Sequence, residues 1–147
     1  MSKVIQAFLS GVFFTFFLDF FVILGVKLNY IDFYEINLYY NILFADHQNI
    51  YIFLSLTIII GYLVIYTQNT KTSLLIIGTL FLLSLFTLIQ PIGYAVGEFI
   101  LMTKNITLKE KKNTFTGDIY YDGRKTITMY DYRLDKIISL NKKDIQP

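Results

Sequence analysis

The alternation of apolar and polar positions divides the chain into three long apolar stretches and a Lys-rich tail that has none. The stretches cover residues 4–28, 50–66 and 73–102. A helix that crosses the hydrocarbon core of a bilayer needs about 20 apolar residues. The first stretch reaches this length, and the second does so only with its tyrosine rings near the two interfaces. We therefore predict three transmembrane helices.

The third stretch is longer than one crossing requires and contains Pro91. Proline removes a backbone donor and distorts a helix interior. The pattern therefore predicts either a kink near Gln90 or an overhang beyond the bilayer. The polar connection over residues 67–72 is short, so the second and third spans are expected to form an antiparallel pair.

The segment between the first two spans, residues 29–49, is acidic and aromatic. Its apolar residues have a spacing that fits a short interfacial helix over residues 33–45, with its apolar face in the acyl boundary. A loop packed over the helix ends explains the same residues.

After Met102 the apolar residues alternate with a period of two, which predicts three or four β-strands over 106–108, 115–121, 126–132 and 136–140. Asp122-Gly123 predicts a two-residue hairpin with positive φ at both positions. The chain therefore divides into a membrane region, residues 1–103, and a β-meander, residues 104–147. The meander is either a minimal SH3-like barrel or a sheet that needs the membrane, a partner or a second copy.

Composition supports an integral membrane protein, because 54% of the residues are hydrophobic and the mean hydropathy is +0.51. The net charge of +2 gives no argument for nucleic acid, and the absence of cysteine excludes thiol chemistry. The single histidine, His47, has no partner at metal-binding spacing, so we expect no metal or cofactor. No nucleophile or phosphate-binding motif is present, so an enzyme is the least supported class.

Lysine and arginine near the span ends favour a cytoplasmic tail. Lys3 and Lys71 lie on one side, whereas the larger group, Lys27, Lys104, Lys109, Lys111 and Lys112, lies on the other. Residues 29–49 share the tail's side yet contain no Lys or Arg, which argues for the opposite orientation. Residue bias suggests an AT-rich bacterial genome, hence a multi-pass protein of the inner membrane. The long apolar core after Met1 fits an uncleaved anchor.

Asp19 is an ionisable residue about two thirds of the way through the first span. A carboxylate at this depth is costly unless it is protonated, paired or facing protein or water. Counting 1.5 Å per residue brings polar residues of all three spans to one layer. The predicted intramembrane cluster consists of Asp19, Ser55, Thr57, Gln90 and Tyr94. It is either a proton or cation site or a hydrogen-bonding layer that sets helix register.

Two smaller features have ordinary alternatives. Gly93 and Gly97 have the i, i+4 spacing that lets another helix approach closely, although glycine is also tolerated generally in membrane helices. The lysine run at 109–112 can touch anionic lipid headgroups or simply end a solvated strand.

These patterns lead to two hypotheses. The first is a non-catalytic accessory, assembly or stabilising subunit that docks a larger membrane complex and contacts membrane lipid. The second is a protomer of a small oligomeric channel or transporter built around Asp19. Either way the expected partner is another membrane protein or a second copy of the chain.

Overall fold

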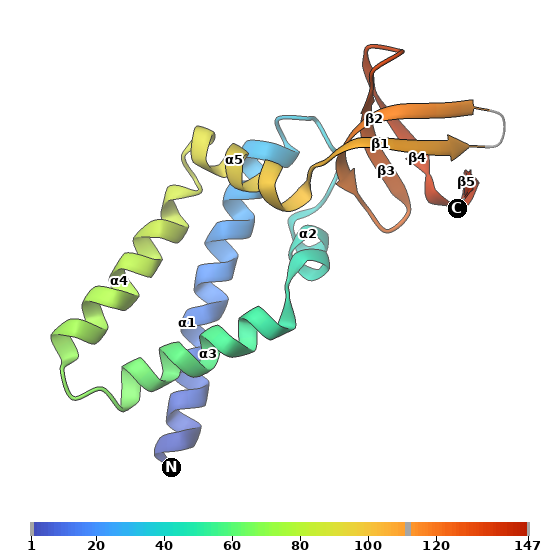
Figure 1. The fold of residues 1–147 in the computed structure, drawn as a ribbon. Helices are drawn as coiled ribbons and strands as arrows, with labels where there is room; N and C mark the ends of the chain where they lie inside the picture. The colour runs from blue at the N-terminus through green and yellow to red at the C-terminus, as the bar shows by residue number, and fades with distance from the viewer. Residues whose placement is uncertain (1, 111–112, 147) are drawn as a thin grey trace.

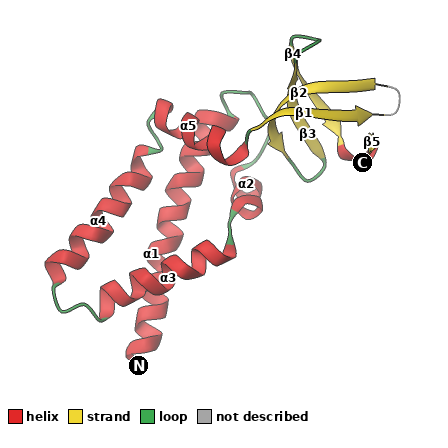
Figure 2. Ribbon diagram, in the orientation of Figure 1, coloured by secondary structure: helices red, strands yellow, loops and turns green. Residues whose placement is uncertain are grey.

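The computed structural model describes residues 2–110 and 113–146. Five α-helices come first in the described chain and an antiparallel sheet follows, and the sheet lies at one end of the helical region, beyond α2 and α5 (Figure 2). The chain's N-terminus lies at the far end of the helices from the sheet (Figure 1).

Helix α1 (Lys3–Val26) continues into a π-helical turn, Lys27–Ile31. The side chain of Ser2 caps its first turn by accepting a hydrogen bond from the backbone N–H of Val4. Together these segments give 29 continuous residues, which is long and apolar enough to cross a membrane. One membrane-capable helix near the N-terminus therefore agrees with the first predicted span.

The other helices reach a comparable length only as bent pairs. Helices α2 (Tyr40–His47) and α3 (Ile50–Ile65) meet at 84°, and α4 (Thr70–Phe86) and α5 (Gln90–Leu101) meet at 89°. Three straight spans are therefore not confirmed. The stretch 73–102 is two helices, and Pro91 lies in the first turn of α5, where its missing N–H costs nothing.

The segment before α2 differs from the predicted interfacial helix over 33–45. Helix α2 begins only at Tyr40, and the residues from Ile36 to Tyr39 have no regular structure. Glu35 has a positive φ of 54°, which stops the preceding helical turn. The apolar spacing was right for the second half of this segment alone.

The C-terminal strands form a sheet in the order β4-β3-β2-β1-β5. Their bounds are β1 (Thr103–Glu110), β2 (Asn113–Asp122), β3 (Thr126–Asp131), β4 (Lys136–Asn141) and β5 (Ile145–Gln146), with a 3₁₀ turn at Lys142–Asp144. One face carries the core: Phe115, Ile119, Ile127, Met129 and Leu140. The predicted two-residue hairpin is wrong, because residues 123–125 connect β2 to β3 and neither Asp122 nor Gly123 has a positive φ.

A β-bulge in β2 turns two tyrosines toward the helices. The register shifts between Ile119, which pairs with Met129, and Tyr121, which pairs with Thr128. The extra residue, Tyr120, reverses the alternation of side chains beyond it. Tyr121 thus leaves the face that holds the sheet's own core.

Candidate functional site at the junction of helices and sheet

The sheet is joined to the helices by a buried apolar cluster. Tyr121 is only 3% exposed and packs among residues of the helical region. The buried members are Ile23, Val26, Tyr30, Ile31, Leu43, Leu101 and Tyr121. Because one sheet residue shares a core with α1, α2 and α5, the sheet cannot reorient without exposing that core.

Tyrosines extend this junction with directed contacts. The hydroxyl of Tyr30, whose side chain is fully buried, donates to the carbonyl oxygen of Tyr120 at 3.1 Å. Tyr34 stacks on Tyr120 with 3.9 Å between ring centroids, and the hydroxyls of Tyr34 and Tyr94 lie 2.5 Å apart. Burial raises the pKa of Tyr34, and its hydrogen bond with Tyr94 acts in the same direction.

An ion pair closes one side of the junction. The guanidinium of Arg124, in the β2–β3 connection, contacts the Asp46 carboxylate of α2 through Nε at 2.7 Å and Nη2 at 2.5 Å. The Tyr121 hydroxyl donates to the other Asp46 oxygen at 3.5 Å. Burial, with a smaller contribution from the Asp46 charge, raises the pKa of Tyr121 to about 12.

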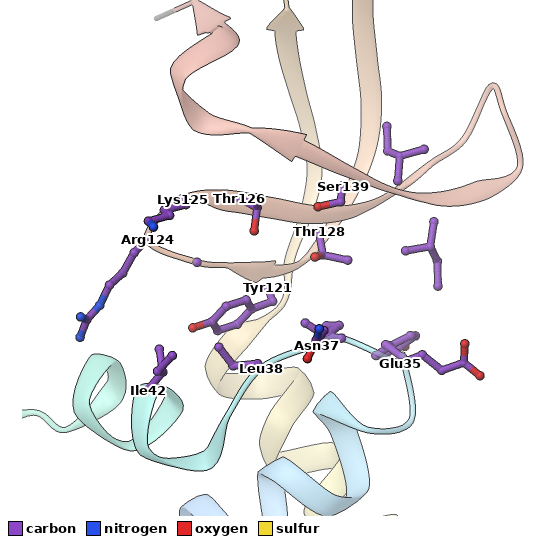
Figure 3. Close-up of a pocket in the computed structure, with 15 residues that line it drawn as sticks. Glu35, Asn37, Leu38, Ile42, Tyr121, Arg124, Lys125, Thr126, Thr128 and Ser139 are labelled. Carbon is purple, nitrogen blue, oxygen red and sulfur yellow. The ribbon is translucent and has the colours of Figure 1, made fainter.

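Beside the junction lies an open cleft of about 680 Å³. One wall is the sheet, with Thr126 and Thr128 of β3 and Ser139 of β4 (Figure 3). The other wall is the segment before α2 together with Ile42 of α2. Tyr121 lies between the two walls. We call this space the β4-edge cleft, lined by Tyr34–Leu38, Ile42, Tyr121, Gly123–Thr126, Thr128 and Ile137–Ser139.

Asp19 faces a second, smaller cavity of about 160 Å³ at the break between α2 and α3. His47, Gln48 and Asn49 line the same cavity. The Asn49 side chain caps α3 by accepting from the N–H groups of Tyr51 and Ile52. A carboxylate beside an interrupted helix is an arrangement that can hold a proton or a small cation.

The structure distributes the residues of the predicted cluster over several places. Thr57 is buried against Gly11 of α1, two turns before Asp19. Tyr94 lies at the junction beside Tyr30 and Tyr34. Ser55 and Gln90 are exposed on their helices. The predicted cluster contained none of the polar residues that line the cavity with Asp19.

The glycine pair of α5 lies against the C-terminal end of α1 and its π turn. A methyl group at Gly93 would overlap the Thr87 carbonyl and the Asn29 amide, and one at Gly97 would overlap the Tyr30 ring. The predicted lysine run falls partly on residues 111 and 112, which lie outside the described residues.

Sequence reasoning missed the contact between α1 and α3. Gly11 lies against the backbone of Thr57, and Gly61 lies against the backbone of Ala7. The signal was present as small residues at i and i+4 on both helices. The buried Thr57 hydroxyl has no hydrogen-bond partner within residues 2–110 and 113–146, so close packing holds this crossing.

The described part of the chain contains no group of three or more His, Cys, Asp or Glu side chains able to hold a metal ion. Comparisons with protein-family models, curated proteins and solved structures found no match.

Proposed function

We propose that this protein is a non-catalytic membrane subunit that holds a small β module in a fixed orientation at the membrane surface, where the module docks another protein. The observation that carries the proposal is the burial of Tyr121, a sheet residue, inside the core of the helical region. A module attached only by a flexible linker would not need this contact. Fixed orientation favours binding because less orientational freedom is lost on association.

The arrangement of the module supports an SH3-like reading. Strand β5 follows β4 through a 3₁₀ turn and pairs with β1 at the opposite end of the sheet order, which is the chain path expected of an SH3-like module. Exposed main-chain and loop surfaces of such small barrels suit the recognition of short peptide segments.

Three crossings of the membrane agree with the helix lengths and surfaces. At 1.5 Å per residue, α3 and α4 are about 24 and 26 Å long, close to the thickness of the hydrocarbon core. Leu74 and Leu75 of α4 are 72% and 70% exposed, which suits contact with lipid. The α3–α4 connection lies near the N-terminal end of α1, away from the sheet (Figure 1). Helices α2 and α5 then lie in the interface on the sheet's side.

The test is extraction in mild detergent at native expression through a tag after Pro147, with the mass and composition of the particle measured together. We expect a defined complex with another membrane protein. Tyr121→Ala should lower recovery of that partner while the chain stays inserted, because the module loses its fixed orientation. Tyr62→Ala, at a 60% exposed ring of α3, is the control. A particle that holds this chain alone would overturn the proposal.

A second candidate function rests on Asp19 and the α2–α3 break. A half-buried carboxylate in one cavity with Gln48, beside two helix ends, supports a protomer of an oligomeric proton or cation pathway. It predicts that Asp19→Asn in liposomes abolishes flux while insertion and abundance stay unchanged. Loss of abundance instead would assign Asp19 a structural role.

A further inference from the structure

Strand β4 is the terminal strand of the sheet order, paired to β3 on one side. A terminal strand presents unpaired N–H and C=O groups along its outer edge. Three consecutive residues of β4, Ile137, Ile138 and Ser139, line the β4-edge cleft. Since successive side chains of a strand point to opposite faces, the backbone of β4 itself must border the cleft.

The cleft has the mixed chemistry that an extended peptide requires. Leu38 and Ile42 supply apolar surface on the helical side, while Thr128 and Ser139 supply hydroxyls on the sheet side (Figure 3). The six residues of β4 offer an edge of about 20 Å. An added strand would gain affinity from its main-chain hydrogen bonds and selectivity from its alternate side chains.

Charge selects among possible occupants. Lys125 lies at the same end of the cleft as Arg124, and Glu35 lies toward the other end (Figure 3). Arg124 is already paired with Asp46, whereas Lys125 has no ion-pair partner among the residues that the structure describes. The free positive charge attracts an acidic side chain.

A second copy of the chain is a poor occupant. Lys136 begins β4 and Lys143 follows its end, whereas Lys142, between β4 and β5, is already paired with Asp122. Lysines along an edge strand oppose pairing between identical copies, because like charges come together.

We propose that the β4-edge cleft binds an extended segment of another protein, which adds as a strand to β4 and carries acidic side chains at the end beside Lys125. This inference rests on the proposed function for the source of the segment, and it names the chemistry of that partner.

The direct test uses the full chain in phosphatidylcholine nanodiscs and fluorescent peptides of about eight residues, the length of one strand. The probe alternates Thr and Val and has two Asp at one end, and its matched partner has two Lys there. We expect one acidic peptide to bind per chain. The affinity of the lysine peptide should be lower by about tenfold or more. Binding should slow amide hydrogen exchange in residues 136–141.

Methylated peptides report strand addition itself. In an added strand only alternate peptide N–H groups face β4. One set of N-methylated alternate residues should therefore abolish binding, whereas the other set should leave it unchanged. If both sets bind alike, the peptide does not add to the sheet and the proposal fails.

Lys125→Glu should lower the affinity for the acidic peptide by about tenfold or more, because an attraction becomes a repulsion. Lys109→Glu makes the same change of charge at an exposed position of β1 and should leave binding unchanged. Equal effects of the two variants would overturn the site.

Other occupants give different outcomes, each of which contradicts the proposal. Protection of residues 136–141 by phosphatidylglycerol nanodiscs without peptide would assign the cleft to a lipid headgroup. Protection that follows self-association would assign it to a second copy. If extraction yields a partner but no peptide binds, only this inference fails and the proposed function stands.

Discussion

Gly11 and Gly61 decide how closely α1 and α3 approach, because each lies directly against the backbone of the facing helix. At such a distance a single methyl group has no space, and the two helices must separate to accept it. Close approach of this kind increases dispersion contacts between helices where lipid offers no hydrophobic driving force between them. The α1–α3 crossing is thus specified by the absence of two side chains.

Gly61→Ala should lower the free energy of unfolding by about 1–3 kcal/mol, because the new methyl overlaps the carbonyl of Ala7. Gly78→Ala is the matched control, since no atom lies within 4 Å of the position its methyl would occupy. Where a helix position has space for a methyl group, alanine is slightly preferred over glycine. Thermal unfolding in detergent compares the two, and equal midpoints would contradict the close crossing.

Tyr121 gives the junction a defined response to alkaline pH. Its pKa is raised to about 12, above the value of about 10 for an exposed tyrosine. The neutral phenol is thus favoured in the folded state, so its contribution to stability is intact below pH about 10 and lost as pH rises through 12.

Between these pH values the native protein should lose more stability than Tyr121→Phe, which has no phenol to ionise at this position. Denaturant midpoints measured across the range report the difference. Tyr51→Phe removes the hydroxyl of a tyrosine that is 80% exposed and should keep the wild-type pH dependence. Identical slopes for the native protein and Tyr121→Phe would show that the phenol is not buried.

At the scale of elements, the corner between α4 and α5 depends on a residue far away in the chain. The Asn29 side-chain amide donates to the carbonyl oxygens of Thr87 at 2.9 Å and Leu88 at 3.2 Å. The Thr87 hydroxyl donates to the Phe21 carbonyl oxygen at 3.0 Å. The two Asn29 bonds satisfy carbonyl groups that the end of α4 leaves without helical partners, and the Thr87 bond ties the corner to α1.

Asn29→Asp should destabilise this corner by about 1–3 kcal/mol, because a carboxylate cannot donate to the two carbonyl oxygens. Asn41→Asp makes the same change at an exposed position of α2 and should have little effect. Hydrogen exchange in residues 86–92 reports local opening of the corner. If both variants exchange at the wild-type rate, Asn29 does not hold the bend.

The same contacts explain which elements the sequence could predict. The strand positions follow from local alternation, and the start of α3 follows from the Asn49 cap. The predicted strands and the predicted second span therefore lie close to the structure. The break after Phe86 depends on Asn29, which no local window contains. The bulge that reverses Tyr121 likewise depends on pairing with β3. Long-range hydrogen bonds therefore determine the α4–α5 break and the bulge in β2, which local sequence patterns could not predict.

At the scale of the whole molecule, the depth count along three straight spans placed Asp19 with the wrong neighbours. It used distance along each helix but had no information on the faces the helices present. The α2–α3 break instead brings Gln48 and Asn49 to the Asp19 cavity. Asp19 itself was identified because a carboxylate inside an apolar span is conspicuous without any structure.

The number of crossings gives the final prediction, and the natural absence of cysteine makes it easy to test. Single cysteines at Lys3, Asn69 and Lys143 report the N-terminus, the α3–α4 connection and the end of the sheet. If α3 and α4 each cross the membrane, a membrane-impermeant maleimide labels positions 3 and 69 from one side and position 143 from the other. If α1 alone crosses and both bent pairs re-enter on the sheet's side, position 69 is labelled together with position 143. We expect the first pattern, because the exposed apolar residues of α3 and α4 need lipid around them.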